Sequence, residues 1–134
     1  MIPRAPSAPR VVAVVGGHVV PVSGPDVPGG TVLLEDGRIV AVGADVAVPE
    51  GAHVVDATGR WVLPGFVEAH GHVGIVEEGE GVAGDDVNEM TGPQMAGVRA
   101  IDAINIDDEG FRDALRGGVT SVVVKPGSGN PIGG

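Results

Sequence analysis

Residues 56–72, DATGRWVLPGFVEAHGH, decide how this chain is divided. A short apolar run ends at Leu63, Pro64-Gly65 interrupts the pattern, and a second apolar run leads into two histidines. Before the break the apolar runs are only a few residues long, with turn residues between them. After it come a strand-like run, a long polar loop, a helical pattern and another apolar run. The sequence therefore predicts a flexible leader (residues 1–10), an N-terminal β-domain (11–63) and a second domain (64–134).

The first domain consists of short β-type runs separated by turn signals. Asp36-Gly37 between two apolar runs is a strong hairpin signal, because both residue types tolerate positive φ. Gly16-Gly17 predicts a tight turn or a bulge between residues 11–15 and 18–22. Five or six short strands with frequent turns are typical of a small β-sandwich or an open barrel.

The second domain has the pattern strand, helix, strand. We expect a strand at residues 66–73, a polar loop at 74–97, a helix from near Asp107 to Arg116 and a strand at 119–124. Asp107 or Asp108 can cap the helix, and Gly117 fits a left-handed C-terminal cap. Near-continuous apolar strands around a helix indicate a βαβ unit whose strands are covered on both faces.

Composition excludes several classes of function. A formal net charge of −10 would repel a phosphate backbone, so nucleic-acid binding is not expected. The chain has no cysteine, so a metal site must use histidine and carboxylate ligands. The apolar run at residues 11–15 is shorter than the roughly 7–15 residues of a signal peptide or the roughly 20 of a membrane span. We therefore expect a cytoplasmic protein without membrane association.

The residues that carry chemistry are His70 and His72. Residues two apart on a strand project from one face, roughly 6–7 Å apart at the backbone, so both imidazoles point the same way. Two neutral imidazoles converging on one point suit Zn²⁺ or a similar divalent ion. Glu68 lies on the same face and could orient a histidine or become a ligand itself. A bare pair of histidines is also common by chance, in surface or core roles.

Residues 56–72 resemble the signature of the metal-dependent amidohydrolase superfamily, in which D-x-x-G-x-x-x-x-P-G leads into a strand that ends in H-x-H. Residues 34–43, LEDGRIVAVG, look like the hairpin that opens the same family. Residues 118–123, GVTSVV, followed by 126–134, PGSGNPIGG, are similar to the second strand and loop of its imidazolonepropionase-like branch. The resemblance covers nearly the whole chain after residue 10.

The resemblance implies a composite, urease-like β-domain joined to a TIM (β/α)₈ barrel, with the metal at the C-terminal mouth of the strands. It implies that His70 and His72 bind the first ion of a mono- or binuclear centre, with Zn²⁺ the expected ion, and that metal-activated water attacks a small (cyclic) amide. In the family, later strands supply the other ligands and an Asp proton acceptor. A barrel takes about 250 residues, whereas residues 64–134 supply 71. We therefore expect an N-terminal, truncated barrel that is inactive by itself, with no catalytic residue in this part.

The sequence departs from the family pattern at two positions. Glu68 stands where Asp is usual, which lengthens the carboxylate side chain by one methylene. Gly71 stands where Thr is frequent, and glycine costs about 0.5–1 kcal/mol in a strand interior. It also leaves the opposite face bare, which would help another element to pack closely.

Other polar residues have plainer interpretations beside the functional ones. The loop after the second strand could contact substrate through Ser128 and Asn130, bind an anion, or be turn structure alone. Lys125 could face the active site, but a solvated strand end is favoured, and His18 and His53 are interpreted as surface or packing residues. Six acidic residues form a solvated loop or select a cationic substrate: Glu77, Glu78, Glu80, Asp85, Asp86 and Glu89.

The main hypothesis is a metal-dependent hydrolase that acts on C–N bonds of small amides. The first alternative is a non-catalytic β-rich module that binds or oligomerises, and the second is a gene fragment with no independent role. Valine-rich strand edges left by an unclosed barrel predict self-association, as a homo-oligomer or as aggregates, when the chain is made alone.

Overall fold

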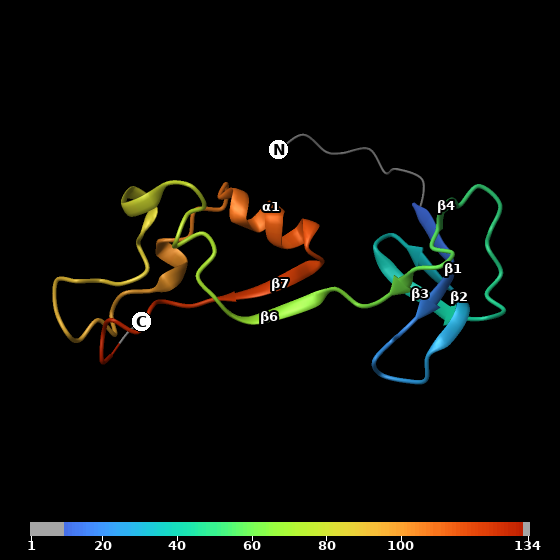
Figure 1. The fold of residues 1–134 in the computed structure, drawn as a ribbon, viewed down its shortest axis with the longest axis horizontal. Helices are drawn as coiled ribbons and strands as arrows, with labels where there is room; N and C mark the ends of the chain where they lie inside the picture. The colour runs from blue at the N-terminus through green and yellow to red at the C-terminus, as the bar shows by residue number, and fades with distance from the viewer. Residues whose placement is uncertain (1–9, 133–134) are drawn as a thin grey trace. The chain divides into compact units, whose positions relative to one another are not determined.

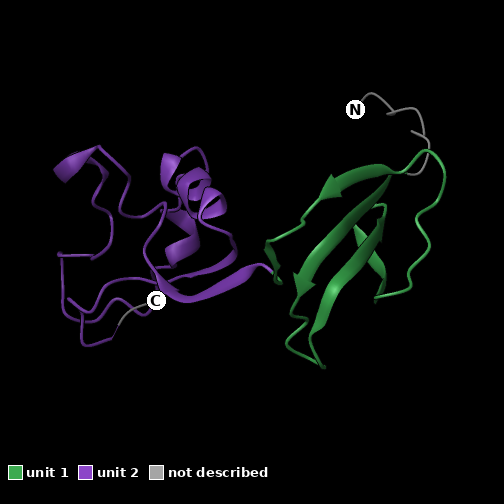
Figure 2. Cartoon of the chain, turned by 45° about the vertical axis from the view of Figure 1, so that its right-hand side comes forward, with its two compact units in different colours: residues 1–64 green, residues 65–134 purple. Residues whose placement is uncertain are grey.

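A computed structural model describes residues 10–132. Residues 1–9 of the expected leader and residues 133–134 of the glycine-rich loop lie outside the described residues. The chain divides between Pro64 and Gly65 into two compact units, coloured separately in Figure 2. No helix in the described part is long and apolar enough to cross a membrane.

Unit 1 is a single five-stranded sheet. Its strands are β1 (Val11–Val19), β2 (Val27–Glu35), β3 (Arg38–Gly43), β4 (His53–Asp56) and β5 (Trp61–Val62). The order is β3-β2-β1-β4, with β5 also paired to β1 (Figure 1). β1 and β2 are antiparallel, as are β2 and β3, whereas β4 and β5 run parallel to β1. The strand content agrees with the sequence, but the described strands do not form the two packed sheets of a sandwich.

The reason for the single sheet is that β1 is one strand with a bulge rather than two strands joined by a turn. Gly16 has φ +77°, and the register with β2 shifts on both sides of Gly17. A bulge bends a strand without ending it. β1 therefore pairs with β2 along most of its length, with β4 through residues 12–15 and with β5 through residues 18–19.

The predicted hairpin at Asp36-Gly37 is confirmed. β2 ends at Glu35 and β3 begins at Arg38, so the loop has two residues. Both loop residues have positive φ, 49° and 79°, which is the conformation of a type I′ turn. The Asp36 carboxylate also accepts a hydrogen bond of 3.0 Å from the backbone N–H of Arg10.

Unit 2 contains the predicted βαβ unit. Parallel strands β6 (Phe66–Gly71) and β7 (Val119–Val124) are connected through the short 3₁₀ turns η1 (Gly81–Gly84) and η2 (Ala100–Asp102) and the helix α1 (Glu109–Arg116). α1 lies alongside β7 in Figure 1. Asp108 caps the helix and accepts a hydrogen bond from the N–H of Gly110. The predicted left-handed cap was placed one residue early, because Gly117 has φ −76° and Gly118 has φ +87°.

The expectation that both strands of this unit are covered on both faces was wrong: Thr120, Ser121 and Val123 of β7 are exposed, and β6 is more exposed still. Residues 66–70 are all exposed, and the side chain of Val67 retains 68 % of its accessible surface. Within the described residues the only α-helix packs against β7, so nothing covers β6 to the same extent. The strand also ends at Gly71 rather than residue 73, because the chain turns at once: Ile75 and Val76 donate their N–H groups to the carbonyl of His72.

Candidate metal centre

The two histidines lie side by side where β6 ends. His70 is the penultimate residue of β6, and His72 follows the last one. Their ring centroids are 5.5 Å apart in an edge-to-face arrangement. β7 ends at the same edge of the parallel pair, because Gly71 is in register with Val124 and the N–H of Lys125 donates to the Gly71 carbonyl. The histidines and Lys125 therefore meet at one point.

A backbone hydrogen bond fixes the tautomer of His72. Its Nδ1 lies 2.6 Å from the carbonyl oxygen of Lys125. A carbonyl oxygen can only accept, so Nδ1 carries a proton, and in the neutral ring Nε2 is then the nitrogen with the lone pair. Histidine ligands of metals are commonly oriented in this way, with one ring nitrogen donating to a carbonyl and the other free for the ion. The half-buried His72 ring thus keeps Nε2 as the nitrogen that a metal ion could use.

His70 has the opposite arrangement. Its Nδ1 lies 3.3 Å from Nζ of Lys125. A charged ammonium can only donate, so Nδ1 accepts and Nε2 carries the proton. The Lys125 side chain is therefore directed at His70, in contrast to the solvated strand end expected from the sequence. In this arrangement His70 can take up a metal only after Lys125 moves aside.

Glu68 bonds the backbone near the pair, and its carboxylate makes no hydrogen bond to either imidazole ring in the described part of the chain. Its carboxylate accepts a hydrogen bond of 2.9 Å from the backbone N–H of His70. This contact fixes the side chain against its own strand. Glycine at position 71 is not required by packing in the described part of the chain, because a Cβ there would meet only Glu68 Cγ at 3.7 Å and the Val123 carbonyl at 3.9 Å.

The donors present suit a divalent ion in kind, but their number is incomplete. Two imidazoles, one with its tautomer already fixed, are nitrogen ligands that Zn²⁺ commonly uses. Among residues 10–132, no group of three or more histidine, cysteine or acidic side chains could hold a metal ion. His70 and His72 can therefore supply two ligands, and the others must come from water or from residues elsewhere.

The loop after His72 is anchored by the buried carboxylate of Asp108. One carboxylate oxygen accepts from the N–H of Gly74 at 2.9 Å, and the other accepts from Glu78 at 2.9 Å and Gly110 at 3.1 Å. Burial by itself raises the pKa of Asp108, and these three hydrogen bonds lower it by more, so the carboxyl titrates below its ordinary range. The helix cap was predicted, but its second function as an anchor for residues 74–78 was not, because that contact joins residues 30 or more positions apart.

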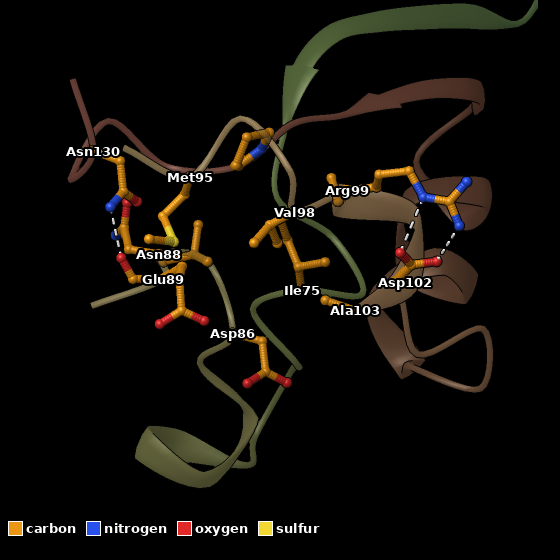
Figure 3. A pocket seen from close by; sticks show the side chains of 13 residues that line it. Ile75, Asp86, Asn88, Glu89, Met95, Val98, Arg99, Asp102, Ala103 and Asn130 are labelled. Carbon is orange, nitrogen blue, oxygen red and sulfur yellow. Dashed lines mark hydrogen bonds and ion pairs between the residues drawn. The ribbon is translucent and has the colours of Figure 1, made fainter. Parts of the chain in front are cut away.

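A cavity of about 330 Å³ adjoins this region (Figure 3). Ile75, Val87, Met95 and Val98 supply apolar wall, and Pro126, directly after Lys125, closes one side. Its remaining lining is polar or small: Asp86, Asn88, Glu89, Arg99, Ala100, Asp102, Ala103 and Asn130. The volume lies at the lower end of the range for small-molecule pockets, about 300–1,000 Å³.

The charges around the cavity are predominantly negative. Arg99 is paired with Asp102 at 2.8 Å, which leaves Asp86 and Glu89 without a cationic partner among the lining residues. Hydrogen bonds from Thr91 hold the pKa of Glu89 below its ordinary value, so this carboxylate is ionised at neutral pH. Of the six acidic residues noted in the sequence, Asp86 and Glu89 line the cavity, and the others do not.

The structure separates the two residues of the expected substrate loop. Ser128 is exposed and does not line the cavity, whereas Asn130 does. The Asn130 amide already donates to the carbonyls of Glu89 and Gly92, at 2.6 and 2.9 Å. His18 and His53 belong to unit 1. There His18 bonds Asp26 at 2.9 Å and lies 4.4 Å from the Trp61 ring, which agrees with a packing role.

Replacing Lys125 with leucine is expected to strengthen Zn²⁺ binding by about tenfold. Repulsion between an ammonium group and a divalent cation about 4 Å apart costs on the order of 1–2 kcal/mol even in water, and 1.4 kcal/mol corresponds to tenfold in affinity. Competition with a chromophoric chelator measures the change. A weaker affinity in Lys125→Leu would instead identify the amine as a ligand.

The chain is similar in sequence and structure to several known amidohydrolases and related enzymes. The solved structure of an amidohydrolase from Thermotoga maritima is 41 % identical, with a TM-score of 0.81 over 90 % of this chain and 31 % of that one. The amidohydrolase tasK of Hapsidospora irregularis is 37 % identical over 108 residues, which are 78 % of this chain and 11 % of tasK. An imidazolonepropionase from Mesorhizobium japonicum is 32 % identical over 120 residues, 75 % of this chain and 29 % of that protein. No family model matches the chain. The chain thus spans less than a third of each of these proteins.

Proposed function

The chain belongs to the amidohydrolase superfamily, and from this premise we propose that it supplies the N-terminal part of a metal-dependent hydrolase of C–N bonds in small, cyclic amides. In this proposal His70 and His72 are the first two ligands of a divalent ion, with Zn²⁺ the expected species, and unit 2 begins a TIM barrel. Unit 1 is the accompanying β-domain.

The observation that carries the proposal is the hydrogen bond from His72 Nδ1 to the Lys125 carbonyl. A histidine with a merely structural role does not need a free Nε2 beside a second imidazole, whereas a metal ligand does. The pair also stands at the C-terminal ends of two parallel strands, where sites on this type of barrel are built. A divalent ion bound there would supply Lewis-acid activation of water and of the amide carbonyl.

The chain's own residues would prepare the substrate side of the reaction. The cavity beside Pro126 is large enough for a small amide, and its apolar wall excludes water from one face of a bound ligand. The acidic side chains that line it favour a substrate with a cationic or hydrogen-bond-donating edge. Turnover requires a proton acceptor and further ligands, so we expect this chain by itself to bind metal and not to hydrolyse amides.

Zn²⁺ titration tests the proposal. The chain contains four histidines, and the His70→Ala/His72→Ala double variant should lose the ion that the wild-type chain binds. The His18→Ala/His53→Ala double variant removes the same number of imidazoles from unit 1 and should retain it. Equal affinity of the wild-type chain and the His70→Ala/His72→Ala variant would refute the site. Circular dichroism of all three chains checks that folding is preserved.

A further inference from the structure

We propose that Asn88 is a positioning residue: it holds the loop of residues 126–130 in place and so keeps the Lys125 carbonyl at Nδ1 of His72. The inference rests on the proposed function in one respect, that His72 serves as a metal ligand. The contacts themselves are properties of the chain alone. The contacts join two segments that lie about 40 positions apart in the sequence, residues 87–92 and residues 126–130.

The half-buried Asn88 side chain lies against the loop. Its Oδ1 accepts a hydrogen bond of 2.7 Å from the N–H of Gly129. A Cβ at Gly127 would lie 2.5 Å from Oδ1 and 2.8 Å from Nδ2 of Asn88, and a Cβ at Gly129 would lie 2.7 Å from Oδ1. A side chain at either glycine would therefore have to displace the Asn88 amide. This close approach explains two of the glycines that the sequence presents only as turn residues.

Further hydrogen bonds join the same two segments. The N–H of Gly127 donates to the Val87 carbonyl at 2.7 Å. From the other side, the Asn130 amide donates to the carbonyls of Glu89 and Gly92, and Figure 3 shows the first of these bonds as a dashed line. Asn88 and Asn130 thus form a clamp between the two segments: the Asn88 side chain bonds the backbone of Gly129, and the Asn130 side chain bonds the backbone of residues 89 and 92.

The clamp acts on the metal centre through two residues. Lys125 is held on one side by β7, where its N–H donates to the Gly71 carbonyl. Pro126 follows it and has no N–H with which to fix itself, while its ring restricts φ. The next residue with a hydrogen-bonded backbone is Gly127, which donates to the Val87 carbonyl, and Gly129 is then held by the Asn88 side chain. The direction of the Lys125 carbonyl is therefore set by the last bond of β7 and by the path of residues 127–129, which Asn88 maintains. That carbonyl is the group that selects the tautomer of His72.

The tautomer of His72 in the metal-free chain provides the test. ¹⁵N NMR of the imidazole, recorded well above the usual histidine pKa of about 6.5, distinguishes Nδ1–H from Nε2–H. In the wild-type chain Nδ1–H should dominate. Asn88→Ala should shift the population toward Nε2–H, the form favoured by free histidine, and should weaken Zn²⁺ binding about tenfold, as loss of an outer partner typically does. Asn88→Asp keeps the oxygen that accepts from Gly129 and should restore both properties.

Gln94→Ala is the matched control. Gln94 is exposed in the same polar segment and should leave the tautomer unchanged. If Asn88→Ala fails to fold, the same spectrum of Asn130→Ala, which removes the opposite half of the clamp, decides the question. An unchanged His72 tautomer in a folded clamp variant overturns the inference. Failure of the wild-type chain to bind Zn²⁺ would overturn the proposed function instead, since the tautomer is measured without metal.

Discussion

His72→Ala is expected to weaken Zn²⁺ binding by about 100-fold, or about 2.7 kcal/mol. In the proposed metal centre, His72 is the residue whose tautomer and ring orientation are already set by the hydrogen bond to the Lys125 carbonyl. Its loss removes one of the two nitrogen donors and leaves the other beside an ammonium group. Chelator competition on the purified chain measures the affinity.

His70→Ala is expected to have a smaller effect in the same chain, about tenfold. Coordination of Zn²⁺ by His70 requires that Lys125 first leave Nδ1, and this displacement reduces the net contribution of His70 to Zn²⁺ binding. The difference between the two variants should therefore shrink when both are made in a Lys125→Leu background. Equal losses in the two single variants of the native chain would contradict the asymmetry that the hydrogen bonds imply.

Asp108→Ala is expected to lower the free energy of unfolding of unit 2 by about 3 kcal/mol. Loss of a helix cap costs about 1 kcal/mol, and each buried donor left without a partner costs about 1–3 kcal/mol. Asp108 serves three donors, and its side chain is buried. Asp108→Asn should be intermediate, because one oxygen can still accept from Glu78 and Gly110 while the amide group faces the N–H of Gly74.

The same substitution has a defined pH dependence. The pKa of Asp108 in the folded chain is lowered, so its contribution is present above the unfolded-state pKa, about 3.9. It is lost as the pH falls through the lower folded-state pKa. The stability gap between the wild-type chain and Asp108→Ala should thus be constant near neutrality and close below about pH 4. Asp56, Glu89 and Glu109 also have lowered pKa values, but they are common to both chains and cancel in the difference.

Urea unfolding followed by hydrogen exchange of residues 74–78 and 109–116 measures this gap in unit 2. Asp107→Ala is the control, because Asp107 is the exposed neighbour and a surface substitution changes stability by no more than about 0.5 kcal/mol. A gap that persists unchanged at pH 3 would show that the carboxylate charge is not what holds the loop.

Local patterns predicted the elements well where short-range chemistry controls them. The Asp36-Gly37 turn, strand Val119–Val124 and the Asp108 cap each depend on residues within a few positions of one another. The local pattern also indicated a turn or a bulge at Gly16-Gly17. It could not predict which of the two forms, because whether Gly16-Gly17 ends a strand or bends it depends on the strands that pair with it. The sandwich expectation failed for this reason.

At the candidate site, the sequence by itself determined which two imidazoles can approach one point, since residues two apart on a strand share a face. The sequence also indicated the family, because the motifs that resemble it can be recognised from the order and spacing of residues along the chain. Only the tertiary structure decided what each histidine can do. The Lys125 carbonyl and ammonium reach His72 and His70 across 53 and 55 residues of chain, and Asn88 reaches Gly129 across 41. These contacts exist because parallel strands bring their C-terminal ends to one edge, an outcome of folding that no local spacing encodes.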